Sequence, residues 1–170
     1  MKRRTLYPIL NEDLFEFYKT AIAARWIVEE VDLSNDKFDE LTQEQQNYLK
    51  NILAFFASSD IIVNENIVTK LITEVPEVEA QFYYCEQLSI EAVHSEMYSL
   101  FIEEYIKDPA EREKLFNGIE ELPAVKKKAE WALKWLESDS FEERMIAFSC
   151  VEMLSFAGVF AGIFFFSTIN

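Results

Sequence analysis

The sequence predicts an all-α fold in which long antiparallel helices pack into a bundle. Only 3 Gly and 4 Pro interrupt 170 residues, and half of the residues are hydrophobic. Strands and tight turns need more frequent turn residues than this. Several long apolar segments also begin with capping signals. Long helices with short connections are typical of helical bundles, and 170 residues suffice for one domain with its own core.

The first three helices are predicted from the signals at their ends. A first helix is expected over about 13–31, and it would end at the turn-like segment 33–36. The capping box Thr42-Gln-Glu-Gln45 opens a second helix, which continues to about Glu74. Proline is favoured in a first helical turn, so Pro76 opens a third helix that ends near residue 107. These helices exceed the usual globular length and can bury a shared core.

Three further helices complete the expected bundle. Asp108-Pro109 caps a short fourth helix, with Glu111 as the expected partner of the cap. Pro123 opens a fifth helix that runs to about Leu136. Ser140-Phe-Glu-Glu143 is a second capping box and opens the last helix.

The last segment is apolar enough to raise the question of a membrane span. Between residues 145 and 169 the only charged side chain is Glu152, and Gly158-Val-Phe-Ala-Gly162 matches a motif of helix dimers in membranes. The length suffices to cross a bilayer. A carboxylate within the hydrocarbon, however, costs on the order of 3 kcal/mol. We therefore expect a core helix that is apolar on all sides and no membrane contact, with a tail anchor as the alternative.

Charge and cysteine content exclude several classes of protein. The formal net charge of −15 argues against nucleic-acid binding, because surfaces that contact phosphates are basic. Cys85 and Cys150 have no CxxC spacing, so buried reduced thiols are expected rather than a zinc or redox site. No apolar stretch of the signal-peptide type follows the basic N-terminus. These features favour a cytoplasmic protein.

The candidate chemistry lies in polar residues within apolar helices. Asp60 and Glu152 are single acids in apolar runs of the second and last helices. The third helix adds Glu91 and His94, which share a face, with Tyr98 one turn further. A lone buried carboxylate must be paired, protonated or bound to a metal. Carboxylates and imidazole bind iron and manganese, so a metal site is predicted. Each acid alone could instead be a hydrogen-bonded core group, and His94 a core histidine.

Six strings, spread over residues 26–152, carry a resemblance to a known family, and the resemblance extends over nearly all 170 residues. They are Trp26-Ile-Val-Glu-Glu-Val-Asp-Leu-Ser34, Leu53-Ala-Phe-Phe-Ala-Ser-Ser-Asp60, Ile62-Val-Asn-Glu-Asn66, Glu91-Ala-Val-His-Ser-Glu-Met-Tyr-Ser-Leu100, Val125-Lys-Lys-Lys-Ala-Glu-Trp-Ala-Leu133 and Glu143-Arg-Met-Ile-Ala-Phe-Ser-Cys-Val-Glu152. With these motifs the chain resembles the small, radical-carrying subunit of class I ribonucleotide reductase, of the eukaryotic and viral type. The resemblance implies a ferritin-like helical bundle.

The resemblance implies a di-metal site and a radical. Asp60, Glu91 and His94 match ligands of the metal nearer the radical, where Glu91 also bridges, and Glu152 matches a ligand of the second metal. The metals would be two iron ions, with manganese or a mixed pair as alternatives. Tyr98 matches the tyrosine that is oxidised to a stable radical when the reduced metals react with dioxygen.

Three aromatic residues also match positions with roles in the family. Trp26 matches the tryptophan that passes an electron toward the metal site. Phe156 and Phe160 match apolar residues that shield the radical, and a phenoxyl radical persists only where water and reductants are excluded. Packing in an ordinary core would explain Phe156 and Phe160 equally well, and the less favoured alternative for Trp26 is a packed aromatic residue near a helix interior.

The resemblance also implies parts that this sequence does not contain. The family supplies a second Glu-x-x-His pair from a later helix, an acid that links the tryptophan to the metal histidine, and a tail that docks on the large subunit. His94 is the only histidine, and the sequence ends at Asn170. Residues 1–170 are therefore expected to form one helical-bundle domain without the family's C-terminal helices and tail. The chain would be half of a split subunit, an incomplete copy or a degenerate subunit. An exposed apolar last helix favours completion by a partner segment.

The expected function is that of the small subunit of ribonucleoside-diphosphate reductase. It would form a homodimer, or pair with a chain that supplies the missing Glu-x-x-His, and would deliver its radical to the large subunit for deoxyribonucleotide synthesis. One alternative is another ferritin-like di-metal oxidase, against which Tyr98 and Trp26 argue. The other is a non-catalytic subunit that stabilises an intact paralogue.

Overall fold

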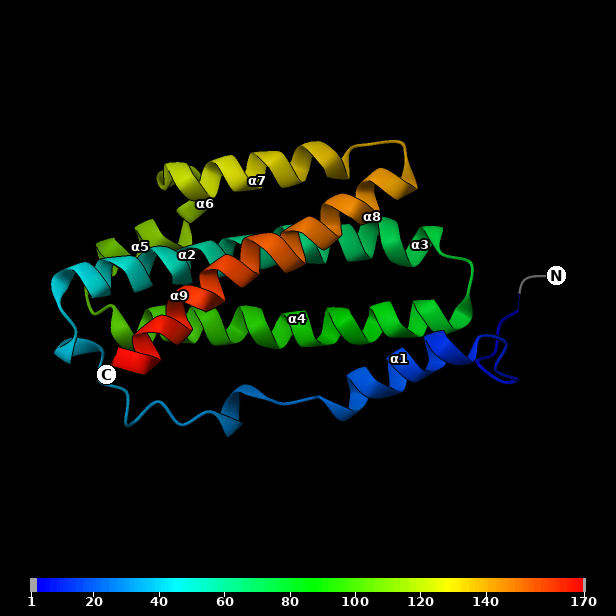
Figure 1. Ribbon diagram of the computed structural model, residues 1–170, viewed down its shortest axis with the longest axis horizontal. Helices are drawn as coiled ribbons and strands as arrows, with labels where there is room; N and C mark the ends of the chain where they lie inside the picture. The colour runs from blue at the N-terminus through cyan, green and yellow to red at the C-terminus, as the bar shows by residue number, and fades with distance from the viewer. Residues whose placement is uncertain (1–2, 170) are drawn as a thin grey trace.

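Two long antiparallel helices form the centre of the molecule. The computed structural model describes residues 3–169, with side chains described to Phe165, and this part of the chain contains helices and no strand. Helix α2 (Gln43–Asn66) continues through a π-helical turn, η3 (Ile67–Leu71), into α3 (Ile72–Glu74). A short loop then leads to α4 (Val78–Tyr105), which returns alongside α2 (Figure 1).

The remaining helices cover both sides of this pair. Helix α1 (Glu12–Ala23) packs on α4, and two short 3₁₀ turns, η1 (Val28–Glu30) and η2 (Phe38–Glu40), lie between α1 and α2. On the other side, α2 is covered by a run of helices, α5 (Pro109–Phe116), α6 (Gly118–Glu121) and α7 (Pro123–Leu136). The bundle is thus layered around α2, as Figure 1 shows.

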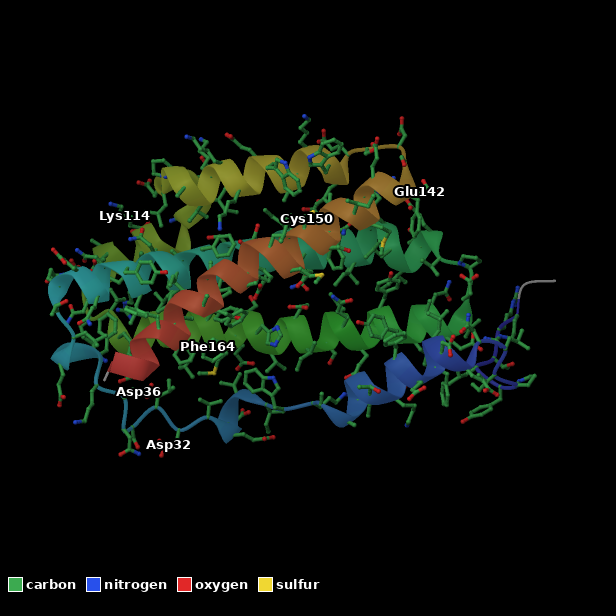
Figure 2. The ribbon with its side chains drawn as sticks, viewed as in Figure 1. Asp32, Asp36, Lys114, Glu142, Cys150 and Phe164 are labelled. Atoms are coloured by element: carbon green, nitrogen blue, oxygen red, sulfur yellow. The ribbon has the colours of Figure 1, made fainter. Side chains whose placement is uncertain are left out.

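The last helix crosses the bundle diagonally. It consists of α8 (Phe141–Cys150), a second π-helical turn, η4 (Val151–Ser155), and α9 (Phe156–Ile169). Helix α8 packs on α7, and α9 contacts α2. Figure 2 shows Cys150 at the middle of this crossing helix and Phe164 toward the end that lies away from α7.

The capping residues explain most of the helix starts. The Thr42 hydroxyl accepts a hydrogen bond from the Gln45 amide, and the Gln45 side chain accepts one from the Thr42 amide, so the predicted capping box is confirmed. Asp108 and Ser140 also cap their helices. The reciprocal half of both later boxes is wrong. Glu111 instead accepts a hydrogen bond from Lys50 Nζ at 2.9 Å, and the Glu143 side chain is bonded to a serine ahead of the helix.

The predicted extent of the first helix is wrong. Helix α1 ends at Ala23 rather than near residue 31, and the chain then runs in an extended conformation to η1. The segment is fixed by contacts to α4 instead of by helical hydrogen bonds. Arg25 pairs with Glu86, and the Trp26 ring lies against His94. Tertiary contacts therefore override the helical pattern of this sequence.

The main hydrophobic core lies where α2, α4 and the crossing helix meet. Its buried members include Phe55, Phe56, Val63 and Phe156. Phe56, Val63 and Ile67 follow helical spacing along one face of α2, so that face is directed into the core.

The expectation that the last helix is a core helix is wrong within the described residues. In the part of the chain that the structure describes, two helices are long and apolar enough to cross a membrane by length and composition. One runs over Gln43–Glu74 and is 61% buried across its most apolar stretch, and the other runs over Phe141–Phe165 and is 11% buried. The second helix packs on its neighbours along one side only, and Met153, Leu154 and Phe164 are exposed.

The glycine motif of this helix has a local explanation. A Cβ at Gly162 would overlap the Tyr48 hydroxyl, so the glycine allows α9 to approach α2 within this chain. A Cβ at Gly158 would meet nothing within 4 Å. The expectation of buried thiols is also partly wrong, because Cys85 is exposed and Cys150 is half-buried.

Candidate metal centre

Three helices bring the four predicted metal ligands to one part of the core. Asp60 comes from α2, Glu91 and His94 come from α4, and Glu152 comes from the π-helical turn of the crossing helix. Asp60 is 1% exposed, Glu91 is buried, and His94 and Glu152 are half-buried. His94 Nδ1 lies 3.0 Å from Glu91 Oε2, so the imidazole and the carboxylate are hydrogen-bonded across one turn of α4.

Helical spacing places Asp60 among core residues. Phe56 lies one turn before it and Val63 one turn after it, and all three are buried. Glu152 is positioned differently, because it lies in a π-helical turn. Such turns shift the register of a helix and often occur at functional sites.

The carboxylates of the site repel one another, and this repulsion adds to burial in raising the pKa values of Asp60 and Glu152. Burial raises the pKa of Asp60 to about 7, with Glu91 and Glu152 adding repulsion and His94 opposing the shift. Burial likewise raises the pKa of Glu152 to about 7, again with repulsion from Glu91. The hydrogen bond that His94 Nδ1 donates to the Glu91 carboxylate raises the pKa of His94, and burial partly offsets this shift. The charges of Asp60, Glu91, His94 and Glu152 therefore act within one acidic cluster that contains a single base.

Two buried oxygen atoms of the cluster have no partner among the described residues. Asp60 Oδ2 and Glu152 Oε1 are buried and accept no hydrogen bond from this part of the chain. A buried acceptor without a donor is destabilising, and a cation would satisfy both atoms and relieve the mutual repulsion. The oxygen and imidazole donors suit iron or manganese. Within residues 3–165, however, no three Asp, Glu, His or Cys side chains form a group that could hold a metal ion by themselves. The four side chains therefore suit a metal ion in their charge and in the type of their donor atoms.

An aromatic row runs from the surface segment to the cluster. The Trp26 and His94 ring centroids are 5.9 Å apart, and the His94 and Tyr98 centroids are 6.3 Å apart. Trp26 lies in the extended segment after α1, whereas His94 and Tyr98 are one turn apart on α4. The structure thus brings Trp26 next to His94 and Tyr98, which belong to a different motif of the sequence.

Tyr98 lies between the acidic cluster and the aromatic core. Its ring stacks on Phe56 with centroids 4.5 Å apart and planes 8° apart. Phe56 in turn contacts Phe156 and Phe160, with centroids 5.6 Å and 5.0 Å away. Burial raises the pKa of Tyr98 above its usual value, and the charges of Asp60, Glu91 and Glu152 raise it further, so the phenol stays protonated. Phe156 is buried, but Phe160 is 39% exposed.

Two further residues of α4 are linked to this site and were not predicted from the sequence. Tyr83 lies about three turns before His94 on α4, and burial together with the charges of Glu152 and Glu91 raises its pKa. Glu86 is buried on the same helix and binds Arg25, the neighbour of Trp26. The helical spacing between Tyr83 and His94 could have indicated Tyr83 from the sequence. No local pattern indicates Glu86, because its partner Arg25 lies 61 residues away in the sequence.

Comparison with known proteins identifies the family. The model of the family "Ribonucleotide reductase, small chain" matches residues 3–170. A ribonucleoside-diphosphate reductase small subunit of Dictyostelium discoideum is 50% identical over 166 residues, which are 95% of this chain and 49% of that protein. The human ribonucleoside-diphosphate reductase subunit M2 is 48% identical and is covered to 43%, with 96% of this chain aligned. The chain spans about half the length of the curated relatives that it matches.

Solved structures agree with this assignment. The Rnr4 homodimer of Saccharomyces cerevisiae ribonucleotide reductase aligns with a TM-score of 0.77 at 33% identity, over 89% of this chain and 49% of that one. The ribonucleotide reductase R2 subunit of Clostridium botulinum aligns with a TM-score of 0.86 at 22% identity, over 99% of this chain and 56% of that one, and supports the fold alone. The chain therefore belongs to the ribonucleotide reductase small-chain family and has its all-α, ferritin-like fold.

Proposed function

We propose that this chain provides the radical-side part of the di-metal centre in a small subunit of ribonucleoside-diphosphate reductase. One observation carries the proposal: the buried, unpartnered oxygens of Asp60 and Glu152 lie in the same acidic cluster as the Glu91–His94 pair. Such a cluster favours a bound cation, and Tyr98 lies directly beside it.

Asp60, Glu91, His94 and Glu152 would hold the metals, which we propose are two iron ions, with manganese or a mixed pair fitting the same donors. Bound metals would supply the oxidising power, drawn from dioxygen, that turns a tyrosine into its radical. At neutral pH the raised pKa values of Asp60 and Glu152 mean that a cation displaces protons when it binds.

The neighbouring aromatic residues would then handle one electron and one proton. Tyr98 is protonated, so it must lose both an electron and its phenolic proton to become a radical. Its stack on Phe56, with Phe156 behind, keeps water from one face of the ring. Trp26 contacts His94 and would carry an electron between the surface and the site.

Further chain segments would complete the subunit. The apolar side of the crossing helix is exposed, and the curated relatives are about twice as long as this chain. We propose that a segment bearing the family's second Glu-x-x-His covers this face, that the assembled subunit forms a homodimer, and that it acts with the large subunit on ribonucleotides in the cytoplasm. A contiguous exposed apolar face is typical of such an interface.

A metal titration tests the proposal. The chain is mixed with a polypeptide corresponding to the second half of the Dictyostelium relative, and Fe²⁺ or Mn²⁺ binding is followed by calorimetry under anaerobic conditions. We expect binding that Glu91→Ala weakens by at least roughly tenfold, while the exposed-site control Glu65→Gln leaves it unchanged. Equal binding by the chain with and without the Glu91 carboxylate would contradict the proposal.

A non-catalytic subunit is the second candidate function. It is favoured by the finding that no three potential ligands among residues 3–165 form a group that could hold a metal ion. The complex of this chain with an intact small subunit and a large subunit distinguishes the two. Full activity with Glu91→Ala supports the non-catalytic role, whereas loss of activity excludes it.

A further inference from the structure

Trp26 is held next to His94 by a segment that has little structure of its own. Helix α1 ends at Ala23 and η1 begins at Val28, so Trp26 lies in an extended connection. Its ring is nevertheless 5.9 Å from the His94 ring on α4. An extended segment does not fix an indole by itself, so contacts from elsewhere must determine this position.

The residue before Trp26 is tied to α4 by a two-pronged ion pair. Arg25 donates from Nε to Glu86 Oε1 and from Nη2 to Glu86 Oε2. This bidentate geometry restricts orientation as well as distance. The Glu86 side chain is 4% exposed, whereas that of Arg25 is 57% exposed. The hydrogen bond from Arg25 lowers the pKa of Glu86, so the carboxylate is ionised at neutral pH.

The anchor and the target lie on the same helix. Glu86 precedes His94 by eight residues, which is about 12 Å along an α-helix. Because α4 is continuous from Val78 to Tyr105, the separation between the two is fixed. The other end of the segment is held by Val28, which is buried in η1 against α4. The connection is therefore pinned on both sides of Trp26.

We propose that Glu86, acting through Arg25, is a positioning residue that holds the Trp26 ring against His94. The consequence for electron transfer rests on the proposed function, but the positioning itself concerns only this chain. A pair with a purely stabilising role would leave the Trp26–His94 contact intact when it is weakened, so the two roles give different results.

The chain offers a matched control on the same helix. Glu79 is also a buried glutamate of α4 paired with an arginine, Arg3, at 2.5 Å. It additionally accepts a hydrogen bond from the Leu10 amide, far from Trp26 in the fold. Glu79→Gln therefore removes the same charge from the same helix without touching the Trp26 segment.

Substituting the glutamate is preferable to substituting the arginine. Removing Arg25 would leave a buried carboxylate unpaired, which is strongly destabilising, whereas removing the Glu86 charge leaves a largely solvated guanidinium. Glu86→Gln keeps the shape, but its amide group presents a donor to the donors of Arg25. The two-pronged bond is then lost with little change in packing.

Fluorine NMR of the chain labelled with 5-fluorotryptophan measures the positioning directly. The chain has three tryptophans, and Trp26→Phe identifies the Trp26 signal. His94→Gln removes the imidazole ring and should shift this signal in the unmodified chain. We expect the response to His94→Gln to be lost in the Glu86→Gln background and kept in the Glu79→Gln background.

Each outcome of this experiment decides the proposal, and the experiment needs neither a bound metal nor enzyme activity. The proposal is wrong if His94→Gln still shifts the Trp26 signal in the Glu86→Gln background. It is also wrong if His94→Gln does not shift this signal in the unmodified chain. Urea unfolding of Glu86→Gln shows whether the fold is retained, and Arg25→Lys, which keeps the charge but not the fork, should give a partly reduced response. Failure of the chain to bind metal would contradict the proposed function alone and would leave this result unchanged.

Discussion

Replacing Asp60 by asparagine should stabilise the metal-free chain at high pH but not at low pH. The folded-state pKa of Asp60 is raised from 3.8 to about 7, mainly by burial. Between pH 3.8 and about pH 7 the folded chain keeps the proton on the Asp60 carboxyl, whereas the unfolded chain has released it. Stability therefore falls as pH rises through this window, and the loss is complete above pH 7. The amide side chain of the Asp60→Asn variant is neutral at every pH, so the variant would lack this loss.

The size of the effect follows from the shift. A change from 3.8 to about 7 is roughly three pKa units, and each unit corresponds to about 1.4 kcal/mol. Because the charges of Glu91, Glu152 and His94 contribute to the shift of the Asp60 pKa, part of this energy belongs to the cluster rather than to Asp60 alone. We expect Asp60→Asn to gain about 2 to 4 kcal/mol over the unmodified chain at pH 8 and close to nothing at pH 4.

Urea unfolding followed by circular dichroism, with a chelator present, measures this difference. The free energy of unfolding is compared for the two chains at pH 4, 6 and 8. Glu65→Gln, which replaces an exposed acid on the same helix, should show no such pH-dependent gain. If the stability difference between Asp60→Asn and the unmodified chain is the same at pH 4 and pH 8, the Asp60 carboxyl does not have a raised pKa in the folded chain.

Three further predictions concern packing and the histidine. Gly162→Ala should lower the free energy of unfolding by about 1 to 3 kcal/mol, because the new methyl group overlaps the Tyr48 hydroxyl. Gly158→Ala, whose methyl group meets open space, should be neutral or stabilising, and urea unfolding compares the two variants. Phe56→Ala should cost about 3 to 5 kcal/mol in the same assay, and a loss below about 1 kcal/mol would show that the aromatic core is not packed as described. Proton NMR of the single histidine should give a pKa above 6.5 for His94, and Glu91→Gln should lower it; the stabilisation from this pair is present below pH 6.5 and is lost as pH rises through the raised pKa.

Local signals predicted most of the helices. The Thr42 capping box and Pro123 mark helix starts in the structure because their effects act within one turn. The end of α1 could not be predicted in this way. Arg25 and Trp26 leave the helix to reach residues of α4 that are more than 60 positions away, and no local pattern reveals such contacts.

The site was predictable in its composition but not in its detail. Single acids in apolar runs indicated Asp60 and Glu152, and the structure places both in one electrostatic cluster with Glu91. The π-helical turn that carries Glu152 has no proline or glycine to signal it. Glu86 escaped notice because one more acid on an acidic helix becomes distinctive only when its partner and burial are known.

Electron paramagnetic resonance detects the proposed Tyr98 radical itself. The chain, together with a segment that supplies the second half of its relatives, is loaded with iron and exposed to dioxygen. We expect a tyrosyl radical signal that disappears in Tyr98→Phe and persists in Tyr83→Phe, although the charges of Glu152 and Glu91 also raise the pKa of Tyr83. A signal that survives Tyr98→Phe, or that is lost only with Tyr83→Phe, would contradict the proposal.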